Sequence, residues 1–135
     1  MAKNNPLVEI FVLCDTALIS RENKLSIIGI FDQIVSDKIP FNYSKITLVA
    51  VLSGHPQTEH TLLLEIKDPA DRVISSISLK VVLGAGGRSN IITELANFPI
   101  TYTGIYKAAL SENKNLLAKS ELSVGKTSQK PQVSN

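Results

Sequence analysis

The longest nearly uninterrupted apolar run in the sequence is LSIIGIFDQIV, at residues 25–35. The run is rich in β-branched side chains, which favour strands, and it is far shorter than the roughly 20 residues that a membrane-spanning helix needs. Polar residues bound it, Asn23 and Lys24 before it and Ser36 and Asp37 after it. An apolar run of this length between polar segments is typical of a strand buried on both faces. We therefore expect residues 25–35 to form the central strand of the fold.

The segments beside this run predict its nearest neighbours. Residues 7–14 predict a first strand that ends at Asp15, and the polar turn at residues 20–24 leads directly into the central strand. Because so short a connection cannot make a parallel crossover, the first and central strands should pair antiparallel. Residues 36–44, which contain Pro40, predict a loop that carries the chain from one sheet to the other.

Further strands follow at short intervals, each bounded by residues typical of turns. They are expected at residues 45–52, 60–68, 73–83, 89–98, 103–110 and 116–124. No stretch has the period and length of an amphipathic helix. About eight strands separated by polar turns predict an all-β fold, a two-layer antiparallel β-sandwich of Ig-like architecture.

The length of the chain bounds its domain organisation. A chain of 135 residues is enough for one domain with a sizeable core, which needs neither a disulfide nor a metal for stability. We expect a polar leader at residues 1–6 and a single β-sandwich domain at residues 7–124. Residues 125–135 have almost no apolar side chains and predict a disordered tail.

Charge and hydropathy argue against several kinds of partner. The net charge is +2 and the lysines are scattered, whereas nucleic-acid-binding surfaces concentrate Lys and Arg on one face. The N-terminal residues lack the apolar segment of a secretory signal, and no apolar run approaches the ~18 residues of a membrane span. We therefore expect a cytoplasmic protein that binds neither nucleic acid nor membranes.

The single cysteine, Cys14, lies among Val12, Leu13, Ala17 and Leu18. This apolar neighbourhood predicts a buried thiol, and one cysteine cannot form an internal disulfide. No positively charged residue stands beside it to stabilise a thiolate, so the sequence does not favour a cysteine nucleophile.

Several turn-and-strand motifs are similar to the landmarks of a known family. They are Cys14-Asp15, KLSIIGIFD at residues 24–32, Ile39-Pro40, DPADRV at residues 68–73, and Phe98-Pro99 followed by Gly104-Ile105-Tyr106. The chain resembles a bacterial family of small uncharacterised β-sandwich proteins, a domain of unknown function. The resemblance covers residues 7–124 and implies a compact β-sandwich, but it implies no activity.

The glycine-rich segment GAGG at residues 84–87 invites comparison with a phosphate-binding loop. Such a loop needs a helix directly after the glycines, because the helix N-terminus holds the phosphate. Here the sequence after the glycines returns to a strand pattern, and we favour a flexible hairpin connection.

Two histidines, His55 and His60, flank the segment PQTE at residues 56–59. With Glu59 they offer three ligands for a transition metal, although a structural zinc site requires four. Residues five apart on a strand point to opposite sides, so we favour surface histidines beside a turn.

Asp15 and Asp32 each lie at or inside an apolar strand, near what would be the same end of an antiparallel pair. Two carboxylates held together can perform acid–base chemistry when their pKa values are split. An Asp at a strand end more often accepts backbone N–H groups of the adjoining turn, and we favour this structural role.

Tyr102 and Tyr106 lie on either side of Gly104, at the entry to a late strand. In sandwiches a tyrosine at such a corner bonds its hydroxyl to the backbone. We expect these tyrosines to be corner residues, with one phenol hydroxyl bonded to the backbone.

Three functions remain compatible with these residues. We favour a non-enzymatic module that binds a protein partner or forms a homo-oligomer through an unprotected strand edge. The alternative is a small-ligand-binding module whose site lies in the end loops at residues 53–59, 84–90 and 111–115. The third is an enzyme that uses Asp15 and Asp32. For the favoured function we expect no catalytic residue, cofactor or metal.

Overall fold

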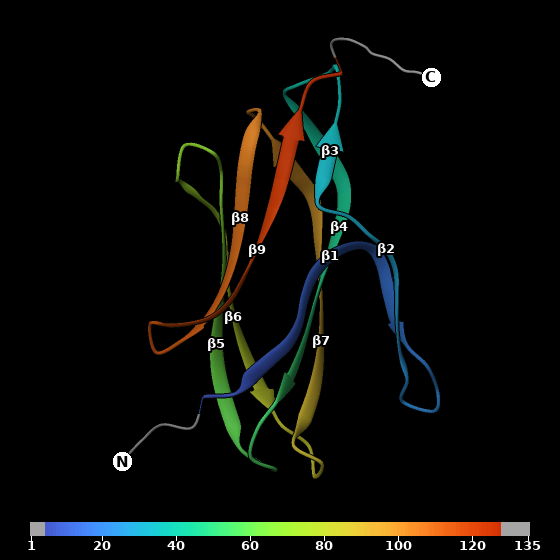
Figure 1. The fold of residues 1–135 in the computed structure, drawn as a ribbon, viewed down its shortest axis with the longest axis vertical. Coiled ribbons are helices and arrows are strands. Elements are labelled where there is room, and N and C mark those ends of the chain that lie inside the picture. Colours follow the sequence, from blue (N-terminus) through green and yellow to red (C-terminus); the bar gives the residue numbers. More distant parts are fainter. Residues whose placement is uncertain (1–4, 128–135) are drawn as a thin grey trace.

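The structure, a computed structural model, describes residues 5–127 of the chain, and this part contains nine strands and no helix. The strands are β1 (Leu7–Ile19), β2 (Leu25–Ile30), β3 (Gln33–Val35), β4 (Phe41–Ser53), β5 (Glu59–Lys67), β6 (Val73–Val82), β7 (Arg88–Ile100), β8 (Gly104–Glu112) and β9 (Asn115–Gly125). They form a four-stranded sheet in the order β2-β1-β4-β7 and a five-stranded sheet in the order β3-β9-β8-β5-β6 (Figure 1). Every pair is antiparallel except β3–β9, which is parallel. The predicted all-β sandwich is confirmed.

The core lies between the two sheets and is built from alternating residues of their strands. In β5 the buried side chains are Leu62, Leu64 and Ile66, in phase with the predicted alternation. From the facing sheet, β4 contributes four buried apolar residues at the same period, namely Ile46, Leu48, Ala50 and Leu52. This period of two places one face of each sheet in the core.

Strand β1 bends, and the β1–β2 hairpin covers the outer face of its own sheet. The first part of β1 pairs with β4 from Leu7 to Cys14, and the second part pairs with β2. In Figure 1 the curved β1 carries β2 away from the line of β4 and β7. Ala17, Leu25 and Ile27 of the hairpin pack against a second apolar cluster. The buried members of this cluster are Cys14, Val49 and Val51. Both faces of β4 are therefore buried.

The prediction of a single central strand at residues 25–35 is wrong. Gly29 adopts φ +75°, β2 ends at Ile30, and the chain then crosses to the other sheet, where β3 pairs with β9. Most side chains of β2 are exposed because β2 is an edge strand paired only with β1. The strand buried on both faces is β4. An apolar run indicates a strand, but it does not indicate which edges and faces other strands will cover.

Two other predicted boundaries also differ from the structure. β1 does not end at Asp15 but continues to Ile19, and the predicted loop at residues 36–44 ends at Pro40, because β4 begins at Phe41. The loop does carry the chain from one sheet to the other, as predicted. The antiparallel pairing of β1 with β2 is confirmed. The strands after β4 agree with their predicted ranges to within two residues.

The predicted leader and tail fall mostly outside the described residues. Residues 1–4 and 128–135 are not described. At the boundary of the predicted tail, Gly125 is the last residue of β9, and the backbone N–H of Thr127 donates to the carbonyl of Ser36 over 3.3 Å. The division at residues 1–6, 7–124 and 125–135 stays a prediction.

Among residues 5–127 the structure contains no helix with the length and apolar content needed to cross a membrane.

Candidate functional site

Each sheet ends in two edge strands, and most of these edges carry features that discourage pairing with another chain. β6 carries the exposed Lys80, β7 contains Glu94 and Pro99, and β3 is only three residues long. Charges, prolines and short length all protect an edge. The six residues of β2, LSIIGI, include no charge and no proline. Within residues 5–127, β2 therefore has the least protected edge.

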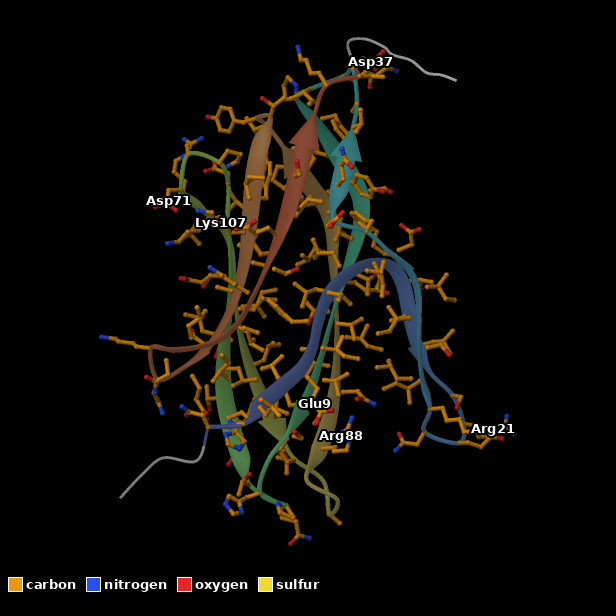
Figure 2. All side chains as sticks on the ribbon, in the orientation of Figure 1. Glu9, Arg21, Asp37, Asp71, Arg88 and Lys107 are labelled. Carbon is orange, nitrogen blue, oxygen red and sulfur yellow. The ribbon has the colours of Figure 1, made fainter. Side chains whose placement is uncertain are left out.

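The β1–β2 hairpin also carries exposed apolar side chains on the face opposite its packed one. Ile28 is 53% exposed, and Leu18 of the paired strand is 49% exposed. The register pairs Thr16 with Ile28 and Leu18 with Ser26, so Leu18 and Ile28 are diagonal neighbours on one face. We call Leu18 and Ile28 the hairpin patch. Figure 2 shows the hairpin, with Arg21 in its turn, projecting beside the sandwich.

Two of the three predicted end loops lie against each other. The backbone N–H of Gly54 donates to the carbonyl of Gly87 over 2.8 Å, and that of Gln57 donates to the carbonyl of Leu83 over 3.0 Å. Gly87 has φ +75°, and a side chain there would collide with the carbonyl oxygen of Gly54. The glycine-rich segment is followed by β7, so the helix of a phosphate-binding loop is missing. The predicted hairpin connection is also wrong, because β6 and β7 belong to different sheets.

The charged groups of these loops are already engaged. Arg88, at the start of β7, lies 2.8 Å from Glu9 of β1 (Figure 2). A hydrogen bond from Ser53, followed by the contact with Arg88, lowers the pKa of Glu9 below its ordinary value. Arg88 is thus part of an ion pair between two strands.

His60 is buried, so the prediction of two surface histidines is wrong for this residue. It is 8% exposed because it continues the inward-facing series of Leu62 and Leu64 on β5. Its Nδ1 lies 2.8 Å from Oε2 of Glu112, the last residue of β8 and itself 5% exposed. Sequence reasoning missed this pair, although the phase of His60 with the core leucines indicated that it points inward. Among the described residues, no three His, Cys, Asp or Glu side chains are placed to hold a metal ion.

The arrangement of Thr58, His60 and Glu112 has the distances of a nucleophile–base–acid triad but not its proton pattern. The Thr58 hydroxyl donates to the carbonyl of His55 over 2.8 Å, so its oxygen must accept from Nε2 of His60, 2.9 Å away. Nε2 of His60 therefore carries a proton. This holds whether the second proton, between Nδ1 and Glu112, belongs to the imidazole or to the carboxyl group. A protonated Nε2 cannot deprotonate the hydroxyl. Through these two hydrogen bonds, His60 instead links Thr58 of the β4–β5 loop to Glu112 at the end of β8. The other carboxylate oxygen of Glu112, Oε1, has no hydrogen-bond partner in the described part of the chain.

Asp15 and Asp32 are both exposed. The carboxylate of Asp15 covers Gly29, where an added side chain would collide with it. Asp32 lies where the chain leaves β2 for β3, and its backbone carbonyl accepts from the N–H of Ser123 over 2.9 Å. Asp15 lies within β1 and not at its end, so the strand-end role predicted for Asp15 is wrong.

Cys14 is fully buried, as predicted. Burial and then the charge of Asp15 raise the pKa of its thiol. Sγ donates to the carbonyl of Thr16 over 3.4 Å. A thiol in this setting is a structural residue of the second apolar cluster.

The predicted tyrosine corner is confirmed. The hydroxyl of Tyr106, a residue only 2% exposed, accepts from the backbone N–H of Thr101 over 2.9 Å and from that of Tyr102 over 3.1 Å. Tyr102 has another partner, because the guanidinium of Arg72 lies 5.5 Å from the centre of its ring. These contacts fix the entry to β8.

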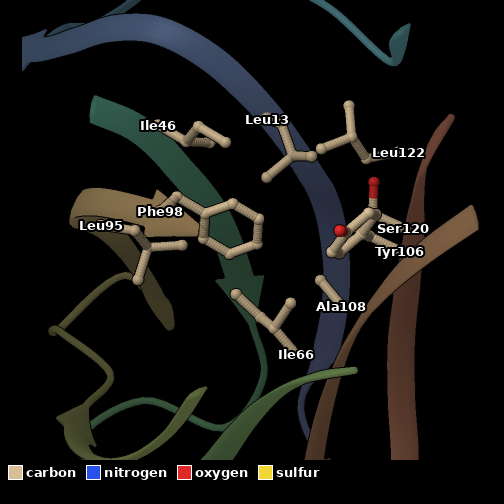
Figure 3. A pocket seen from close by; sticks show the side chains of 9 residues that line it. All are labelled: Leu13, Ile46, Ile66, Leu95, Phe98, Tyr106, Ala108, Ser120 and Leu122. Carbon is tan, nitrogen blue, oxygen red and sulfur yellow. The ribbon is translucent and has the colours of Figure 1, made fainter. Parts of the chain in front are cut away.

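A small cavity lies in the core (Figure 3). Its lining is apolar and comes from both sheets, including Leu13, Ile46, Phe98 and Tyr106, and its volume is about 10 Å³. A single water needs roughly this much space, so the cavity cannot hold an organic ligand.

The two packed sheets and the tyrosine corner define an immunoglobulin-like β-sandwich, and solved structures agree. An immunoglobulin-like protein from Pseudomonas aeruginosa matches with a TM-score of 0.50 and 14% identity, over 89% of this chain and 96% of that one. A DNA glycosylase, AlkC of Pseudomonas fluorescens, gives a TM-score of 0.53 and 13% identity over 91% of this chain. A β-glucosidase from Listeria innocua gives 0.52 and 9% over 91%. The chain spans 31% of the glycosylase and 16% of the β-glucosidase, so these similarities show the fold alone.

Within this class, residues 9–125 match the family of unknown function DUF6941. The match covers most of the chain, and the chain belongs to this family. The resemblance drawn from the turn-and-strand motifs is thereby confirmed. No curated protein matches the sequence.

Proposed function

We propose that this chain is a non-enzymatic interaction module that binds a protein by adding a strand to the free edge of β2. The observation that carries the proposal is the combination found on the β1–β2 hairpin. Its outer edge is uncharged and unpaired within residues 5–127, and the hairpin patch beside it is exposed. An added strand gains main-chain hydrogen bonds from such an edge and specificity from side chains beside it.

The rest of the molecule gives reasons to place function at this edge. The core cavity is too small for an organic ligand. The hydroxyl of Thr58 already donates its proton to the carbonyl of His55, so His60 cannot activate it as a nucleophile. The carboxylate of Asp15 covers Gly29, and both Asp15 and Asp32 are exposed. A cytoplasmic location belongs to the same proposal, because a buried single thiol needs no oxidising compartment.

The test is native mass spectrometry on tagged full-length protein gently purified from its source cells, compared with the Ile28→Lys variant. We expect a mass above that of one chain, from a second copy or a second polypeptide, and its loss in the variant. Lysine on an edge strand opposes pairing without disturbing the core. Val82→Lys is the matched control. Val82 is 60% exposed on the edge strand β6, where Lys80, two residues before it, already carries a positive charge. A bare monomer for the parent protein, or equal masses for the parent and Ile28→Lys, would count against the proposal.

A second candidate function is small-ligand binding at the end loops, and one specific observation favours it. The loops at residues 53–59 and 84–90 are hydrogen-bonded to each other, and Glu112 from the third loop offers a buried oxygen that has no donor within residues 5–127. A ligand with an N–H or O–H group would satisfy that oxygen. Thermal-shift measurements with a panel of amines, polyols and amides test it, since a bound ligand raises the melting temperature by mass action. A panel without any shift, or a shift that survives Glu112→Leu, would remove this candidate.

A further inference from the structure

We infer that the outer face of the five-stranded sheet binds an extended acidic segment of a partner protein, in a groove that follows β8. The groove lies on the other sheet from β2, so the inference does not depend on the proposed strand addition. The β1–β2 hairpin covers the outer face of the four-stranded sheet. On the five-stranded sheet, the outward residues Thr61 and Leu63 of β5 are exposed. This face is therefore open to a partner.

The groove exists because the outward side chains of β8 are small. Ala109 and Ser111 form its floor, and Leu63 of β5 and Leu116 of β9 lie directly across from Ser111 on either side. Leu63 is 38% exposed and Leu116 is 59% exposed. Two adjoining hollows of about 500 and 250 Å³ share Ala109 and Leu116 in their lining. Hollows of this size accept whole side chains, whereas the core cavity does not.

Lysines line both ends of the groove. Lys67, Lys107 and Lys119 line one end, and Lys114 lines the other. Lys67 of β5 lies directly across from Lys107 of β8, and like charges at directly opposite positions destabilise a sheet. Within residues 5–127 none of the four lysines forms an ion pair. A partner with carboxylates would supply the counterions that these lysines lack.

Three carboxylates lie on the same face, and they limit where the partner's own carboxylates fit. Glu65 lines both hollows, Asp71 lines the end that contains Lys107 (Figure 2), and Glu121 lies across from Lys107 on β9. Because Glu65 lies between the two ends, we expect the partner's carboxylates at the ends, beside the lysines, and not in the middle.

The turn between β8 and β9 gives a separate indication. Its two residues, Asn113 and Lys114, have φ +51° and +69°. Glycine is favoured at the second position of such a turn, because a positive φ strains most other residues. Lysine at this position therefore weakens the turn. Its side chain lines the groove, and we attribute its presence to binding.

An extended peptide fits these dimensions. A strand rises by about 3.3 Å per residue, so β8 and its turn span about 20 Å from Lys107 to Asn113. A segment of about six residues covers this length, with an apolar side chain between Leu63 and Leu116 and a carboxylate towards each end. The lining residues of the two hollows, all within residues 5–127, include no aromatic ring on which a nucleic-acid base could stack. This favours a protein segment over a nucleic acid.

Fluorescence anisotropy with the full-length chain and the labelled peptide EESLSEE tests the inference. We expect EESLSEE to bind at least tenfold more tightly than QQSLSQQ or KKSLSKK. Lys67→Glu/Lys107→Glu should weaken the binding of EESLSEE by about tenfold. The matched control is Lys24→Glu/Lys38→Glu, which reverses two exposed lysines outside the five-stranded sheet and should retain binding.

Two further variants separate the groove from general electrostatic attraction and from folding. Ala109→Phe fills the floor without changing the charge, and it should abolish the binding of EESLSEE. Lys114→Gly should weaken binding while raising the melting temperature, because it relieves the turn. Circular dichroism melting of every variant confirms that the fold is intact.

The opposite results overturn the inference. Equal affinity for the three peptides, or no binding of EESLSEE at about 1 mM, removes the acidic segment as occupant. An equal loss in Lys24→Glu/Lys38→Glu, or full binding by Ala109→Phe, removes the groove as the site. Tighter binding of labelled oligothymidine that is lost in Lys67→Glu/Lys107→Glu assigns the face to a nucleic acid instead. Ile28→Lys should bind EESLSEE like the parent, so failure of this inference leaves the proposed strand addition unaffected.

Discussion

Replacing His60 by leucine tests whether the buried pair with Glu112 is an electrostatic unit. The variant removes the only hydrogen-bond partner recorded for the Glu112 carboxylate in the described part of the chain, since Oε1 has none. The side chains of His60 and Glu112 are 9% and 6% exposed, so water cannot replace the imidazole. The carboxylate is then buried without a counterion or a donor.

The expected cost follows from this burial. Breaking a buried ion pair by removing one partner costs about 3–5 kcal/mol, because the remaining charge is left unpaired. Unfolding entropy of about 2.1 cal/mol/K per residue gives roughly 0.28 kcal/mol/K for a chain of this length, so Tm should fall by about 11–18 °C. The double variant His60→Leu/Glu112→Leu leaves no buried charge and should recover to within about 1 kcal/mol of the parent.

Urea unfolding followed by circular dichroism measures both free energies of unfolding. Lys80→Ala provides the matched control, because Lys80 and Glu59 form an exposed pair at 3.9 Å whose loss should cost less than about 1 kcal/mol. A deficit below about 1 kcal/mol at neutral pH, or a double variant as unstable as His60→Leu, would refute the electrostatic argument.

Other parts of the fold give predictions of the same kind. Tyr106→Phe leaves two backbone N–H groups without their acceptor, and a loss of about 2 kcal/mol, or roughly 7 °C in Tm, should appear in thermal melts. The backbone N–H of Arg72, with its guanidinium, lowers the pKa of Asp68, so the stability supplied by this carboxylate is complete at neutral pH and disappears as the pH falls through the lowered value. The gap in Tm between the parent and Asp68→Ala should therefore close in acid, and a gap that is independent of pH would contradict the charge effect. Burial raises the pKa of Cys14, so a maleimide should label it at neutral pH only after unfolding, as mass spectrometry with and without urea can measure.

The sequence predicted this fold well wherever the signal was an alternation of apolar and polar residues or a turn motif. The alternation of Leu62, Leu64 and Ile66 gave the inward face of β5, and it holds because a two-layer sandwich buries one face of each strand. The tyrosine corner at Tyr106 was also predictable, since its hydroxyl bonds to backbone only a few residues away. Features determined within about ten residues of sequence are therefore accessible without a structure.

Features that depend on strand order were not accessible. His60 and Glu112 are 52 residues apart, and they meet only because β5 lies beside β8 in the five-stranded sheet. The misassigned central strand has the same cause. Its apolar residues indicate a strand, but whether Leu25–Ile30 is covered depends on where the sheet stops.

The apolar residues of β2 have two different explanations, and only one of them lies within the fold. Leu25 and Ile27 pack with Val49 and Val51, because the bent hairpin covers the outer face of β4. Ile28 follows Ile27 on the opposite face of the strand and is 53% exposed, so the stability of this chain gains little from it. A hairpin that only covered β4 would be equally stable with a polar residue at this position and would be protected from aggregation. We therefore propose that a partner strand accounts for the exposed Ile28 and the uncharged edge beside it, and the native mass of Ile28→Lys compared with that of Val82→Lys tests this.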